Sequence, residues 1–157
     1  MSTDEGTRVR QASLGLRIWR IILIVLCLFV AIGALAGLCI AFIPGLDALV
    51  GADEIIPVLQ QTPYVGSYIN SLIIPGIFLL LLVFLPQLTA SIHLLRWRKR
   101  QYRSGISAGA FLIVCMIGEL ILIPSFLAWI YLGIGAAQIC VGVVCLVLRS
   151  RNRNKFI

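Results

Sequence analysis

The sequence is short of charged residues, and long stretches of it carry none. Charged side chains make up 12% of its 157 residues while 61% are hydrophobic, and a typical soluble domain carries about twice that share of charge. Between Arg103 and Arg149 the single charged residue is Glu119. Because a helix needs about 20 mostly apolar residues to cross the bilayer core, this scarcity argues against a soluble domain and predicts a membrane protein.

Residue sets that carry out chemistry are also missing from the sequence. The cysteines have neither the Cys-x-x-Cys nor the Cys/His spacing of zinc and redox sites, and none lies in the segment 44–71, where an oxidising compartment would favour a disulfide. The sequence shows no Ser/His/Asp set, no paired carboxylates and no glycine-rich phosphate loop. We therefore predict no catalytic residue, no metal site and no cofactor, and a protein that is not an enzyme.

Three apolar runs are long enough to cross a membrane. The third is too long for a single span, and a turn near Pro124 and Ser125 divides it into two, which makes four spans. The sequence thus predicts an all-α fold, a bundle of four transmembrane helices, with spans at about 21–43, 72–95, 105–124 and 127–148. The single membrane domain, 17–149, is expected to lie between a mobile N-terminal segment, 1–16, and a basic tail, 150–157.

Positive charge is confined to three segments of the chain. All 13 Lys and Arg residues lie before the first span, between the second and third spans, or after the fourth. With four spans these segments share one side of the membrane, and the positive-inside rule places that side, with both termini, in the cytoplasm. We expect the clusters to contact anionic lipid head groups of the plasma (inner) membrane, and we expect no binding of nucleic acid.

The segment between the first two spans, 44–71, is at once apolar and acidic. Asp47, Asp53 and Glu54 stand among leucine, isoleucine and valine residues. Interfacial helices that bind anionic lipid are typically basic, so this segment is expected to form a partly helical outer cap over the bundle. A docking surface for a partner is the alternative.

Small residues recur at spacings that allow close helix packing. The first span contains Gly33-x-x-x-Gly37. One face of the fourth span carries, at alternating steps of four and three, Tyr131, Gly135, Gln138, Gly142, Cys145 and Arg149. Such spacing is typical of packed helices, and small residues let two backbones approach closely. We expect both faces to pack inside the bundle or against a second protein.

Glu119 is the strongest candidate for a functional residue. A charge at mid-membrane costs about 2.5–3.5 kcal/mol on insertion scales, so such residues face the bundle interior, find partners or become neutral. Reflection across the turn that follows Glu119 places Tyr131 or Leu132 opposite it, and the Tyr131 hydroxyl is the expected partner. Two interpretations stay open: an acid that ties the third helix to a neighbour, or a proton- or cation-coupled site.

Two glutamines lie at membrane depth as well. Gln138 is near the middle of the fourth span, and Gln87 follows Pro86 in the second. Membrane glutamines form hydrogen bonds between helices, and we expect this of both. Because Pro86 cannot donate a backbone hydrogen bond, we also expect a kink in the second helix there.

One stretch of the chain, TPYVGSYINSLIIPGIFLLLLV, resembles the junction of the outer loop and second helix in small bacterial four-helix membrane proteins of no known activity. In those proteins a Thr/Ser-Pro-aromatic stretch and a tyrosine lead into an Ile-Pro-Gly that opens an apolar helix; Ile74, Pro75 and Gly76 occupy that place here. The resemblance implies a bacterial inner membrane and brings no activity with it.

Three functions remain open at the level of sequence. The first is an accessory or interaction subunit of the bacterial inner membrane, which binds a larger membrane protein or a second copy through the fourth-span face and the Gly33/Gly37 face. The alternative is a small oligomeric proton- or cation-coupled transporter with Glu119 as the coupling acid. Its route would be lined by polar side chains of the second and fourth spans: Gln87, Gln138 and Tyr131. The third is a membrane-embedded enzyme acting on lipid, with His93 or Glu119 as its base.

Overall fold

The regular structure of this chain is helical wherever it is described. The computed structural model describes residues 3–43, 56–57, 60–61, 66, 73–96, 101–122 and 125–153. Four of its helices are long and apolar enough to cross a membrane, over Leu14–Phe42, Ile73–Leu95, Gln101–Ile121 and Phe126–Ser150. The all-α fold and the four predicted spans are thereby confirmed, whereas the outer cap expected at 44–71 lies almost wholly outside the described residues.

Three of the four long helices extend at one or both ends beyond the apolar runs from which the spans were predicted. The elements are α1 (Thr3–Phe42), α3 (Ile73–Leu79), the π-helix η3 (Leu80–Phe84), α4 (Leu85–Leu95), α5 (Gln101–Leu122) and α6 (Phe126–Arg153). Helix α1 has 40 residues, about 60 Å at 1.5 Å per residue, which is twice the bilayer core. Residues 3–16, predicted as a mobile segment, belong to the same helix as the first span, and no proline occurs among them.

The second span is not a uniform α-helix. It widens into the π-helix η3 over Leu80–Phe84, where the Leu85 N–H donates to the carbonyl of Leu80. Pro86 follows in the first turn of α4. Its ring lacks a backbone donor and would collide with the carbonyl four residues earlier in a regular α-helix. One wider turn relieves that collision, so the helix accommodates Pro86 by a π-turn, which the sequence did not predict.

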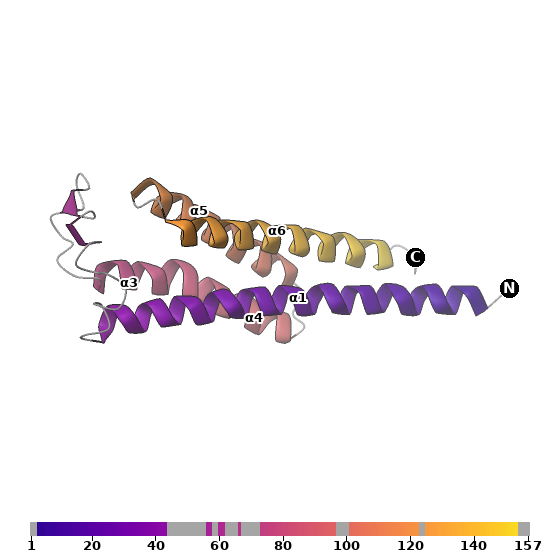
Figure 1. Cartoon of the computed structure of the whole chain (residues 1–157). Coiled ribbons are helices and arrows are strands. Elements are labelled where there is room, and N and C mark those ends of the chain that lie inside the picture. Colours follow the sequence, from indigo (N-terminus) through magenta and orange to yellow (C-terminus); the bar gives the residue numbers. More distant parts are fainter. Residues whose placement is uncertain are drawn as a thin grey trace.

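The spans form a ring in which each helix packs on two neighbours. Helix α1 lies between α6 and the α3–η3–α4 span, and α5 lies between that span and α6. The most extensive contact is the one between α5 and α6. Both termini lie at the same end of the bundle (Figure 1), and apolar side chains such as Val114 and Ile121 cover its outside.

The interior of the bundle consists of two apolar clusters, one above the other. The cluster nearer the α4–α5 connection contains Leu23, Cys27, Ala90, Leu94, Tyr102, Ala108, Val141 and Cys145. The other contains Val30, Ala34, Val83, Leu112, Met116 and Ala128. Many of these side chains are small, which brings the helix backbones close together.

Arg20 fixes α1 against the end of α4. Its side chain is only 8% exposed, and its guanidinium donates to the carbonyl of Leu94 through Nε at 2.9 Å and through Nη2, and to the carbonyl of Leu95 at 3.2 Å. The last carbonyls of a helix have no partner within it, and a cation there is favoured by the helix dipole. Arg20, counted from the sequence among the lipid-contacting cations, is therefore a cap for α4.

Replacing Arg20 tests this cap. Arg20→Gln should lower the free energy of unfolding in mixed micelles by about 2 kcal/mol, because a hydrogen-bonded charge is worth about 1.5–3 kcal/mol. Arg20→Lys should lose less, since it keeps the charge but cannot bridge two carbonyls with a planar fork. The control is Arg17→Gln, an exposed residue one turn earlier, which should change little. Equal losses at both positions would contradict the assigned cap.

Candidate functional site

Two glutamines at the centre of the bundle bond to each other. Gln87 of α4 and Gln138 of α6 are fully buried. Gln87 Nε2 donates to Gln138 Oε1 at 3.0 Å, and Gln138 Nε2 donates to Gln87 Oε1 at 3.1 Å. Gln87 Nε2 also donates to the carbonyl of Ala108 in α5 at 3.3 Å. The amide pair thus ties three helices together, at a level between the two apolar clusters.

A glycine contact between α5 and α6 brings the backbones close beside this pair. A Cβ at Gly109 would lie 2.9 Å from the carbonyl oxygen of Gly135 and 3.0 Å from the Cβ of Gln138, and one at Gly135 would lie 3.1 Å from the carbonyl oxygen of Gly109. Neither position tolerates a larger residue. Gly109 was not among the glycines predicted to pack, although Gly105 and Gly109 form a G-x-x-x-G motif that is typical of close helix packing.

The four glycines predicted to serve helix packing all face other helices of the same chain. A Cβ at Gly33 would collide with the Tyr131 hydroxyl of α6, and one at Gly37 would lie 2.8 Å from Leu79 Cδ2 of α3. In α6, Gly135 and Gly142 both face α5. The two faces on which a partner was expected to dock are therefore occupied within the bundle, and a partner would need another surface.

Glu119 accepts a hydrogen bond from the residue immediately before α6. It is partly buried near the end of α5, and Ser125 Oγ donates to its Oε1 at 3.3 Å. The same oxygen of Ser125 accepts the backbone N–H of Ala128 at 3.1 Å, which is the geometry of a helix N-cap. Glu119 thus holds the capping hydroxyl in place, and a carboxyl group beside a helix N-terminus is favoured by the helix dipole.

Tyr131 is not the partner of Glu119 that the sequence predicted. Its hydroxyl instead lies against Gly33 of α1. The prediction assumed that the nearest polar group across the turn would be on α6, whereas Ser125, immediately before α6, is nearer. The four polar residues expected to line a route therefore form separate groups: Gln87 with Gln138, Glu119 with Ser125, and Tyr131 on Gly33.

The described residues offer no cluster of metal ligands, and His93 is the candidate base among them. Among the described residues no three His, Cys, Asp or Glu side chains lie close enough to hold a metal ion. His93, the candidate base for lipid chemistry, has its Nδ1 buried without a hydrogen-bond partner in the described residues, so nothing there orients it as a base.

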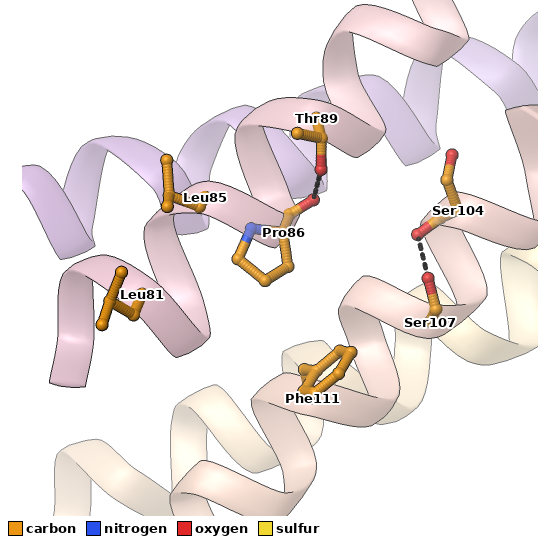
Figure 2. A pocket seen from close by; sticks show the side chains of 7 residues that line it. All are labelled: Leu81, Leu85, Pro86, Thr89, Ser104, Ser107 and Phe111. Atoms are coloured by element: carbon orange, nitrogen blue, oxygen red, sulfur yellow. Dashed lines mark hydrogen bonds between the residues drawn. The ribbon is translucent and has the colours of Figure 1, made fainter.

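Two recesses on the outside of the bundle were not foreseen from the sequence. One is a groove between the second span and α5, lined by Leu81, Leu85, Pro86, Thr89, Ser104, Ser107 and Phe111 (Figure 2). The other is an apolar hollow between α5 and α6, lined by Ile113, Ile117, Leu120, Ile121, Trp129, Leu132, Gly133 and Ala136. Neither includes Glu119, Tyr131 or the two glutamines. Recesses between helices depend on how faces pair, which the residue pattern along one helix does not reveal.

A double-mutant cycle on the amide pair measures its strength. Gln87→Leu and Gln138→Leu should each destabilise the bundle by about 1–3 kcal/mol, because the remaining amide is left buried without its partner. The double variant should lose less than the sum of the two, since no amide is then left unpaired. Unfolding in mixed micelles gives the coupling energy, and strictly additive losses would show that the pair does not act as a unit.

The capping role of Ser125 predicts that two conservative changes lower the stability of the protein to different extents. Ser125→Ala should cost about 1 kcal/mol, the usual loss for an N-cap, whereas Glu119→Gln should cost little because the amide oxygen still accepts from Ser125. Ser107→Ala is the control, since Ser107 donates only to Ser104 of its own helix. Thermal unfolding in detergent compares the three, and a large loss in Glu119→Gln alone would require a role for the acid proton itself.

The class of the protein follows from its helices, and comparisons with other proteins add nothing to it. The chain matches no protein-family model, and searches of curated proteins and of solved structures find no similar protein. The function proposed below therefore rests on side-chain geometry. At the level that the four apolar helices support, the chain is a multi-pass membrane protein.

Proposed function

We propose that this chain is an interaction subunit of the bacterial inner membrane, which binds a transmembrane helix of another membrane protein. The observation that carries the proposal is the hollow between α5 and α6. All of its lining residues are apolar or glycine, and they lie inside two membrane spans. An ion or polar substrate finds no partner in such a recess, so its occupant has to be apolar.

Gly133 favours a helix over lipid as that occupant. A Cβ added to Gly133 would meet no atom within 4 Å, so the glycine leaves its backbone accessible from the membrane. Ala136 and Cys140 follow on the same exposed face of α6. Small residues at this spacing allow a second helix backbone to approach closely, and this is the main way in which membrane helices associate.

The proposed orientation has both termini in the cytoplasm. Three basic segments flank the spans, the two termini lie at one end of the bundle (Figure 1), and Arg20 of α1 reaches the end of α4. The cationic segments thus gather at one end, which the positive-inside rule assigns to the cytoplasm. The acidic segment 44–71 would then cap the opposite end, a proposal that the sequence pattern alone supports.

The placement of the polar residues favours interaction over transport. A coupled route through Glu119 would need polar groups leading away from it across the membrane. Glu119 instead bonds to the cap of α6, and the two glutamines satisfy each other. Each of these groups has a structural use within the chain.

The test is to block the hollow and look for the partner. Extraction in native lipid followed by mass measurement of the intact complex should find the chain with a second protein at fixed stoichiometry. Gly133→Leu should remove that protein, because the leucine fills the place of the incoming helix, while the empty space above Gly133 leaves the fold unaffected.

Gly118→Leu is the matched control for this experiment. Gly118 also has open space above it but does not line the hollow, so this variant should keep the partner. A wild-type chain that remains single in native lipid would contradict the proposed function. A complex with a second copy that Gly133→Leu dissociates would keep the surface and change the identity of the partner.

A further inference from the structure

The groove between the second span and α5 passes from apolar to hydroxyl-bearing side chains along its length, and it does so in the same direction on both walls. On the wall formed by η3 and α4, the apolar Leu81 and Leu85 are followed by Thr89. On the α5 wall, Phe111 is followed by Ser107 and Ser104 towards the start of the helix. Figure 2 shows these side chains lining the two sides of one open groove. The groove is therefore apolar in its deeper part and carries hydroxyl groups nearer the end of the bundle.

Both walls continue into an exposed arginine. Arg96 lies seven residues beyond Thr89, hence two turns further on the same face of the helix, and Arg103 lies four residues before Ser107 on one face of α5. Both arginines are exposed and form no ion pair with a described residue. Five residues, 96–100, separate the two helices, and none of them is acidic. The mouth of the groove thus holds cations without a nearby carboxylate from this connection.

The hydroxyl groups leave acceptor oxygens in the groove. Thr89 Oγ1 donates to the carbonyl of Pro86 at 2.9 Å, Ser104 Oγ to that of Gln101 at 2.8 Å, and Ser107 Oγ to that of Ser104 at 3.0 Å. Each hydroxyl proton is thereby used within its own helix, while the oxygen lone pairs remain available. A ligand suited to this region has an apolar part, a negative charge, and hydroxyl groups near that charge that can donate to these oxygens.

We propose that this groove binds one anionic phospholipid, of the phosphatidylglycerol kind, from the leaflet at the basic end of the bundle. The acyl chain lies along Leu81, Leu85 and Phe111. The polar part of the lipid lies beside the hydroxyl groups, and the phosphate pairs with Arg96 and Arg103. The apolar part of the groove suits an acyl chain, the two exposed arginines suit the phosphate, and the acceptor oxygens beside them suit the hydroxyl groups of the terminal glycerol, folded back from the phosphate. The site goes beyond the proposed interaction function, because it uses a different recess and needs no partner protein.

The experiment measures phosphatidylglycerol binding to the purified full chain in mixed micelles, with bound lipid counted by intact-mass measurement. Phosphatidylcholine and inorganic phosphate are the comparison ligands. We expect one tightly held phosphatidylglycerol and no comparable binding of the other two. In R96Q/R103Q its affinity should fall about 30-fold, which is the expected effect of removing two cations near a membrane surface.

Two further variants separate a built site from general attraction between charges. R10Q/R17Q removes two cations from α1 at the same end of the bundle and should keep the bound lipid. Ser107→Phe keeps every charge but fills the groove at an exposed position, and should lose the lipid without lowering the unfolding temperature of the lipid-free protein. Equal losses in R10Q/R17Q and R96Q/R103Q would overturn the proposal, as would full binding in Ser107→Phe. Displacement of a protein partner, instead of lipid, by Ser107→Phe would overturn it as well.

Discussion

The reciprocal amide pair of Gln87 and Gln138 is the interaction on which the arrangement of the helices depends. In the hydrocarbon core no water can satisfy a polar side chain, so each amide has to find its partner inside the bundle. The pair lies beside the close approach of α5 and α6 at Gly109 and Gly135. Because Gln87 also reaches the backbone of α5, one polar contact fixes three helices in a single register. The apolar clusters on either side then fill the space that this register leaves.

The same requirement explains the two charged residues that the bundle partly encloses. Arg20 is held by the terminal carbonyls of α4, and Glu119 by the hydroxyl that caps α6. Each therefore meets a helix terminus, where backbone groups lack partners within the helix and the dipole favours a charge of that sign. An acid in a membrane span is a functional candidate by default. Here the capping contact gives Glu119 a structural use.

With its polar groups used internally, the bundle offers partners and lipids only its outer faces. The hollow at Gly133 is apolar throughout, whereas the groove at Thr89 ends in hydroxyl groups and arginines. The hollow therefore suits the apolar surface of a helix, the occupant proposed for it, and the groove suits the phospholipid proposed there. The π-turn before Pro86 belongs to the second of them, since Leu81 and Pro86 line the groove.

The sequence by itself determined that this chain crosses a membrane four times, because span length and apolar content are properties of each segment alone. It also indicated which residues were costly enough at membrane depth to need partners, namely Glu119, Gln87 and Gln138. Only the tertiary structure decided which residues these polar side chains contact. Ser125 in place of Tyr131, Gly109 as the counterpart of Gly135, and Arg20 on α4 all depend on the rotation of neighbouring helices about their axes. Periodicity along one helix shows that a face is special but not which helix it meets, and so the glycine faces expected to bind a partner proved to be internal.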